Sequence, residues 1–168
     1  VGFYRTHSQS RVFEEELRRN NIHYTIVGGV KFYARREIKD LLAYLKVTYN
    51  SGDEVNLLRI INVPKRGIGK GAMEKLRTFS LEKGISLYEA IGRYSQENKT
   101  SEKLKQGLVR FYQMIENFKK TSPVVPLSSL LQTIIDSTGY VTALEHENTV
   151  EAKVRVENIR EFFISVKE

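Results

Sequence analysis

Apolar residues recur every three or four positions along most of this chain, which predicts a mainly α-helical protein. Helices are expected over about 9–20, 34–49, 101–120, 127–137 and 151–166. The helix over 101–120 has the clearest apolar stripe, and we expect that stripe to lie in the core: Leu104, Leu108, Phe111, Ile115 and Phe118.

The N-terminal part of the chain has a different pattern. Residues 1–4 are typical of the end of a strand, and 24–27 of a second short strand that Gly28 and Gly29 close. With the helix over 9–20 between them, residues 1–29 are predicted to form a β-α-β fragment. The sequence therefore predicts two parts, 1–29 and an all-helical domain over 30–168.

A Gly-Ile-Gly turn between two short helices is the most informative local feature. The first helix is expected to begin after an Asp53 cap, bury its apolar residues Val55, Leu58 and Ile61, and stop before Pro64. The second carries Ala72, Leu76 and Phe79 and should end at Gly84, and a further short helix has a capping box at Ser86 and Glu89. This arrangement resembles a helix-hairpin-helix.

The turn is suited to holding a phosphate. Gly67 and Gly69 can adopt positive φ and let a nucleic-acid backbone come close, and the free N–H groups of the second helix point toward it. The residues predicted to contact such a backbone are Lys65, Arg66, Gly67, Ile68, Gly69 and Lys70. The alternative is an ordinary helix–turn–helix corner with a solvated basic edge.

A second basic cluster lies near the junction of the two predicted parts. It is either a further DNA contact or a solvated helix face that offsets Glu37 and Asp40. Its members are Lys31, Arg35, Arg36 and Lys39.

Charge supports a polyanionic partner. The net charge is +7, and the segment from Arg59 to Arg77 carries six basic residues against one acid. From Asp136 to Glu168 seven acids face four bases, so the attraction belongs to the rest of the chain.

The sequence lacks the motifs of several other kinds of site. The turn matches neither a Walker A loop nor a dinucleotide fingerprint, because Pro64 and Ala72 replace required glycines. The chain has no cysteine, and neither His23 nor His146 has ligand spacing, so we expect no disulfide, no metal site and no catalytic residue. No apolar run approaches ~18 residues, so we expect a soluble intracellular protein without membrane contact.

Taken together, six stretches of the sequence resemble the superfamily 1 DNA helicases of the UvrD, Rep and PcrA type, and are nearest to the PcrA branch. The first, from Tyr4 to Arg11, is similar to helicase motif IV. The others run over 28–33, 37–45, 62–69, 137–140 and 155–162, so the resemblance covers nearly the whole chain.

The resemblance implies that the chain is a fragment. Residues 1–29 would belong to the RecA-like motor domain 2A, and 30–168 to its helical insertion, domain 2B. The parent would be an ATP-driven 3′-to-5′ DNA helicase of bacterial DNA repair or replication, at the nucleoid in the cytoplasm. ATP and magnesium would bind outside this fragment, which would hold no cofactor and be inactive alone. Arg5 matches an arginine that contacts single-stranded DNA, and His7 stands where these helicases usually have asparagine.

Two functions remain open for the fragment. The first is a binding and regulatory module that holds duplex DNA by its phosphates next to the single-strand junction, attached to the rest of the motor. The second is a protein-interaction module that docks repair or transcription proteins. Nothing in the sequence favours a free-standing enzyme, because no nucleophile–base pair or carboxylate dyad has suggestive spacing.

Overall fold

The computed structural model describes residues 10–24, 31–97 and 101–167, and it is helical there, without a strand. The helices are α1 (Ser10–Arg19), the 3-10 helix η2 (Phe32–Ala34), α2 (Arg36–Tyr49), α3 (Glu54–Ile60), α4 (Lys70–Lys83), α5 (Leu87–Tyr94), α6 (Glu102–Thr121), α7 (Leu127–Thr138), α8 (Tyr140–Glu147) and α9 (Val150–Lys167). The mainly α class is confirmed. The first predicted strand and most of the second lie outside the described residues, so the β-α-β fragment stays a prediction.

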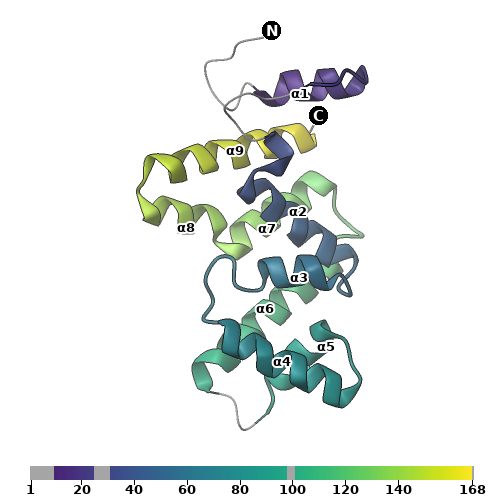
Figure 1. Cartoon of the computed structure of the whole chain (residues 1–168), viewed down its shortest axis with the longest axis vertical. Helices are drawn as coiled ribbons and strands as arrows, with labels where there is room; N and C mark the ends of the chain where they lie inside the picture. Colours follow the sequence, from purple (N-terminus) through teal and green to yellow (C-terminus); the bar gives the residue numbers. More distant parts are fainter. Residues whose placement is uncertain (1–9, 25–30, 98–100, 168) are drawn as a thin grey trace.

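The molecule is elongated, with α1 beside α9 at one end and α4 and α5 at the other (Figure 1). Helix α2 is the centre, because it contacts α3, α6, α7 and α9. Its side chains are buried on almost every side, including Ile38, Leu41 and Tyr44, each fully enclosed. Helix α6 packs against α2, and four residues of its predicted apolar stripe are also fully buried: Leu108, Phe111, Ile115 and Phe118.

Local signals in the sequence set most helix ends. Asp53 caps α3 by accepting a hydrogen bond from the Asn56 N–H, and Ser86 with Glu89 forms the expected capping box of α5. Gly84 and Gly139 end α4 and α7 in the left-handed conformation. The predictions for Asp53, Gly84, Ser86 and Glu89 are confirmed.

Two helices differ from the predicted pattern. Of the predicted apolar face of α3, Ile61 is 2% exposed and Leu58 is half-buried, but Val55 is 79% exposed, so the prediction was wrong for Val55. Leu57 and Ile60 are buried as well. Helix α8 follows Gly139 directly and has no counterpart in the sequence analysis. Tertiary contacts hold it: the Tyr140 hydroxyl donates to the Asp40 carboxylate of α2 at 2.6 Å, and Leu144 is buried.

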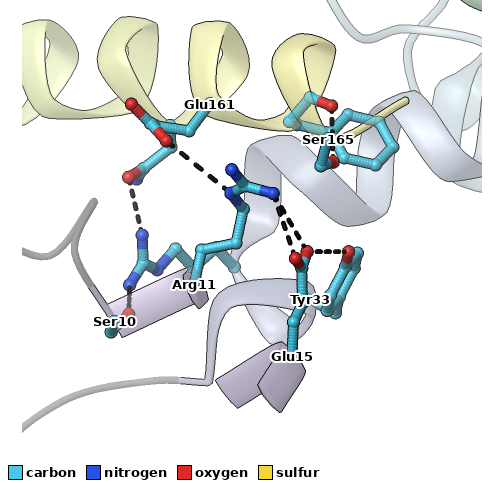
Figure 2. A network of polar contacts seen from close by, with 9 residues as sticks. Ser10, Arg11, Glu15, Tyr33, Glu161 and Ser165 are labelled. Atoms are coloured by element: carbon cyan, nitrogen blue, oxygen red, sulfur yellow. Dashed lines mark hydrogen bonds and ion pairs between the residues drawn. The ribbon is translucent and has the colours of Figure 1, made fainter. Parts of the chain in front are cut away.

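Polar contacts join α1 to the helical body (Figure 2). The Arg11 guanidinium donates to the Glu15 carboxylate at 3.1 Å and lies 3.6 Å from the Glu161 carboxylate of α9. The Glu14 carboxylate, also buried, accepts a hydrogen bond from the Phe32 N–H at 3.1 Å. Residues 10–24 therefore pack on η2 and α9 through buried charges rather than through an apolar face.

Asn158 of α9 is central to a second polar group next to these contacts. Its side-chain oxygen accepts from the Arg35 guanidinium at 2.6 Å, and its amide donates to the Glu37 carboxylate at 2.6 Å. All three side chains are buried. One neutral amide therefore makes a hydrogen bond with each of two buried charged groups.

None of the helices in the described ranges is long and apolar enough to cross a membrane.

Replacing the buried side-chain amide of Asn158 should destabilise the protein. We expect Asn158→Ala to lower the free energy of unfolding by about 3 kcal/mol, because two buried charged groups each lose a hydrogen bond. Urea unfolding followed by circular dichroism measures the change. The control is Gln132→Ala, which removes an exposed amide from α7 and should change the value by less than about 0.5 kcal/mol. Equal effects of the two substitutions would contradict the role given to Asn158.

Candidate nucleic-acid interface

The Gly-Ile-Gly turn connects the end of α3 to the start of α4 on one side of the molecule (Figure 1). Residues Lys65, Gly67, Gly69 and Lys70 are exposed there, whereas the Ile68 side chain is 2% exposed and reaches the core. Ile68 therefore anchors the turn, and the glycines and lysines form its outer surface.

Arg66 points inward rather than toward a ligand. Its guanidinium donates to the carbonyl oxygens of Ile60 and Pro64, both at 3.1 Å, and to the Tyr44 hydroxyl at 2.6 Å. The guanidinium carbon also lies over the ring of Phe111, 5.6 Å from its centre. These contacts do not favour the predicted phosphate contact for Arg66 and give it a structural role instead.

Tyr44 of α2 is the partner that fixes this guanidinium. Burial raises the pKa of Tyr44 to about 12, although the neighbouring Arg66 charge acts in the opposite direction. The hydroxyl therefore keeps its proton at neutral pH, donates to the Val63 carbonyl and accepts from Arg66. The central helix thus holds the turn at two points.

Asn62 shapes the turn from within. Its side-chain oxygen accepts hydrogen bonds from the N–H groups of Arg66 at 2.7 Å and Ile68 at 3.3 Å. Gly67 adopts the predicted positive φ, 76°, but Gly69 does not, since its φ is −86°. The prediction for Gly69 was wrong because Gly67 alone makes the left-handed step between the two N–H groups that Asn62 binds.

The first turn of α4 is open to a ligand. Gly69 is its N-cap and provides no side-chain cap, and no acidic residue lies in the first turn. A Cβ built on Gly69 or Gly71 would meet no atom within 4 Å. Exposed N–H groups and the positive end of the helix dipole therefore face solvent, next to the exposed Lys70 ammonium.

The structure separates the members of the second basic cluster. Arg35 is 8% exposed, donates to Asn158 and to the Ser10 hydroxyl, and stacks on Phe32, so burial does not favour it as a DNA contact. Lys31, Arg36 and Lys39 are exposed. The acids Glu37 and Asp40 are buried, and Asp40 pairs with Arg59 at 2.7 Å, so this is not a simple solvated face.

The two residues predicted to contact single-stranded DNA, Arg5 and His7, lie outside the described residues. In the ranges that the structure covers, no three His, Cys, Asp or Glu side chains gather where they could hold a metal ion.

Sequence reasoning missed Gly107 of α6, which lets this helix press against the turn. A Cβ on Gly107 would lie 2.6 Å from the Arg66 carbonyl oxygen, so a larger residue would displace the backbone. The signal was a glycine inside a long helix, where it costs about 1 kcal/mol relative to alanine and needs a reason. Because of this contact, Lys103 of α6 lies next to Gly67.

Comparison with known proteins gives consistent matches. The sequence model of the family described as UvrD-like helicase C-terminal domain matches residues 3–168. The ATP-dependent DNA helicase PcrA of Staphylococcus epidermidis is 45% identical over 159 residues, and that of Staphylococcus aureus is 43% identical. The matched region is 95% of this chain, which spans 22% of the length of these curated relatives.

The inward position of Arg66 yields a test of its role. We expect Arg66→Ala to lower the free energy of unfolding by about 3 kcal/mol, because it removes a charged donor from several carbonyl groups and from Tyr44. Arg66→Lys should recover little of this stability, since an ammonium lacks the planar set of N–H donors with which a guanidinium reaches several acceptors at once. Denaturant unfolding measures both, with exposed Lys65→Ala as a control of near-zero effect. If Arg66→Ala left the free energy of unfolding unchanged, Arg66 would be free to bind a ligand.

Proposed function

The chain belongs to the UvrD-like helicase C-terminal domain family, and from this we propose that it holds the backbone of duplex DNA within a larger ATP-dependent DNA helicase. The parent would unwind DNA in the 3′-to-5′ direction during repair or replication at the bacterial nucleoid. The helical part, 30–168, would grip the duplex ahead of the junction with the single strand and regulate the motor. Its relatives are named ATP-dependent DNA helicases, which supports the proposal.

The observation that carries the proposal is the uncapped start of α4. The first N–H groups of a helix have no partner within the helix, and at α4 Gly69 offers no capping side chain and the first turn has no acid. A phosphate oxygen supplies the missing acceptors and the favourable charge at once. The open space over Gly69 and Gly71 lets a sugar–phosphate backbone approach these N–H groups directly.

Two side chains at the turn add charge to this site. Lys65 and Lys70 are exposed, and no ion pair within the described residues includes either of them. Arg66 holds the turn in shape beneath them, so we assign it an indirect role. Lys31, Arg36 and Lys39 are proposed as further contacts. Phosphate contacts carry no sequence information, so binding should be indifferent to base sequence and sensitive to salt.

The N-terminal residues are proposed to belong to the motor domain. Helix α1 leaves Val12 and Phe13 exposed, at 58% and 56%, and Ile22 after it is 53% exposed. Large apolar side chains gathered on one segment favour a covering partner. The part of the parent absent from this chain, about four fifths of its relatives' length, could supply the rest of that domain. Arg5 and His7 would then face its single-stranded DNA.

The alternative function is docking of repair or transcription proteins by the helical surface. Docking through apolar contacts would not weaken steeply with salt, whereas phosphate binding would. The salt dependence of any partner therefore distinguishes the two functions.

The first functional prediction concerns ATP. We expect the purified chain neither to bind nor to hydrolyse ATP, with or without single-stranded DNA, because its sequence holds no phosphate-binding loop of the Walker type. Phosphate release and equilibrium dialysis with labelled ATP measure this. Hydrolysis that co-purifies with the chain and disappears when one of its own residues is changed would contradict the prediction.

The second functional prediction tests the start of α4. Lys70→Gln should weaken duplex binding equally for unrelated sequences and reduce the slope of log affinity against log salt by about one unit. Gly69→Val should also weaken binding, because its side chain would occupy the open space over the N–H groups. Its φ of −86° lets valine fit, so stability should hold. Fluorescence anisotropy over a salt series measures both.

Gly67→Ala is the control for damage to the turn. Its positive φ makes alanine strained by about 1 kcal/mol, so it should lower stability without removing charge. If Lys70→Gln and Gly69→Val keep both the affinity and the salt slope of the unchanged chain, the turn is only a structural corner, and the docking function takes precedence.

A further inference from the structure

A groove next to the turn carries charge that the turn itself does not use. It has a volume of about 620 Å³ and lies between the turn, α6 and the end of α7. We call it the α6 groove. Its lining residues include the exposed side chains Lys65, Lys103, Gln106, Arg110, Asn117 and Ser137.

The charge of the α6 groove is uncompensated. Its lining contains four basic residues and no acidic one; the basic residues are Lys65, Arg66, Lys103 and Arg110. In the part of the chain that the structure covers, no ion pair includes Lys103 or Arg110. Two other grooves on the molecule each contain carboxylates among their basic residues, Glu89 in one and Glu145 with Glu157 in the other. The α6 groove is therefore the one of these three that attracts an anion.

The spacing of these residues suits an extended ligand. Lys103 and Arg110 are seven residues apart, two turns along one face of α6, so they are separated by about 10 Å along the helix axis. A single DNA strand rises by about 3.4 Å per nucleotide, so that distance corresponds to about three nucleotides. Gln106, Asn117 and Ser137 supply neutral donors of the kind that bind phosphate oxygens.

The groove also continues directly from the turn. Gly107 brings the α6 backbone against the Arg66 carbonyl, and a Cβ on Gly67 would lie 3.5 Å from the Lys103 side chain. Lys65 lies on the turn and also lines the groove. A backbone held at the turn is therefore next to the Lys103 side chain.

We infer that the α6 groove is a second phosphate-binding site, which continues the DNA contact of the turn along α6 through Lys103 and Arg110. The inference rests on the proposed function, since it extends the same duplex contact by at least two phosphates. The two lysines of the turn alone would make a short contact, and the groove lengthens it to several nucleotides of one strand.

The test is the double substitution Lys103→Gln and Arg110→Gln in this whole chain. We expect it to reduce the salt slope of binding to a blunt DNA duplex by about two units, because two phosphate contacts are lost. The matched control is Lys153→Gln with Arg160→Gln, which removes the same charge from exposed positions on α9 in a groove that contains glutamates. It should leave the slope unchanged. Thermal unfolding checks that both variants fold.

A charge-retaining variant separates charge from shape. Lys103→Arg with Arg110→Lys should keep the salt slope of the unchanged chain. An equal loss in the α9 control would overturn the inference, because general charge rather than the groove would then explain binding.

The two proposals fail in distinguishable ways. If Lys70→Gln weakens binding and the groove variant does not, the α6 groove is not a DNA site while the function of the turn stands. If only the groove variant weakens binding, the groove is a DNA site and the role of the turn is wrong. If the groove variant keeps its duplex affinity but loses binding of polyglutamate, the groove takes an acidic protein and the inference is overturned.

Discussion

The hydrogen bonds of the Arg66 guanidinium are the contacts on which the candidate interface depends. They tie the carbonyls that follow α3 to the Tyr44 hydroxyl of the central helix, while Asn62 binds the N–H groups on the other side of the turn. Gly107 then allows α6 to lie against the same backbone. The half-buried Arg66 guanidinium therefore sets the position at which the exposed lysines and the start of α4 meet solvent.

The centre of the molecule and the end formed by α1 and α9 are held together by different forces. Around α2 the contacts are apolar and fully enclosed, with Leu41, Phe111 and Leu130 among them. Between α1, η2 and α9 the buried groups are mainly charged or polar, including Arg11, Glu14 and Asn158. Buried charges stabilise a contact only when each is matched, and they specify one arrangement over others in some proteins. If the N-terminal residues belong to the motor domain, as proposed above, these contacts define how the helical part sits on it.

Much of the fold was predictable because its signals are local. The apolar stripe of α6, the Asp53 cap and the capping box at Ser86 all lie within a few residues of the elements they define. Helix α8 was missed because its support comes from Asp40, 100 residues away in the sequence. The inward position predicted for Val55 was wrong for a related reason: a seven-residue helix has too few turns for its own pattern to decide which side meets α2.

The sequence by itself determined the class of the protein, the places of most helices and the basic turn that resembles a helicase motif. Only the tertiary structure decided which basic residues face solvent. Arg35 and Arg66 look like any other surface arginine in the sequence, but their partners Asn158 and Tyr44 are 123 and 22 residues away and draw them inside. Lys103 and Arg110 looked unrelated to the turn until Gly107 brought α6 beside it. Charge is a property of a residue, whereas its availability to a ligand depends on the distant groups that compete for it.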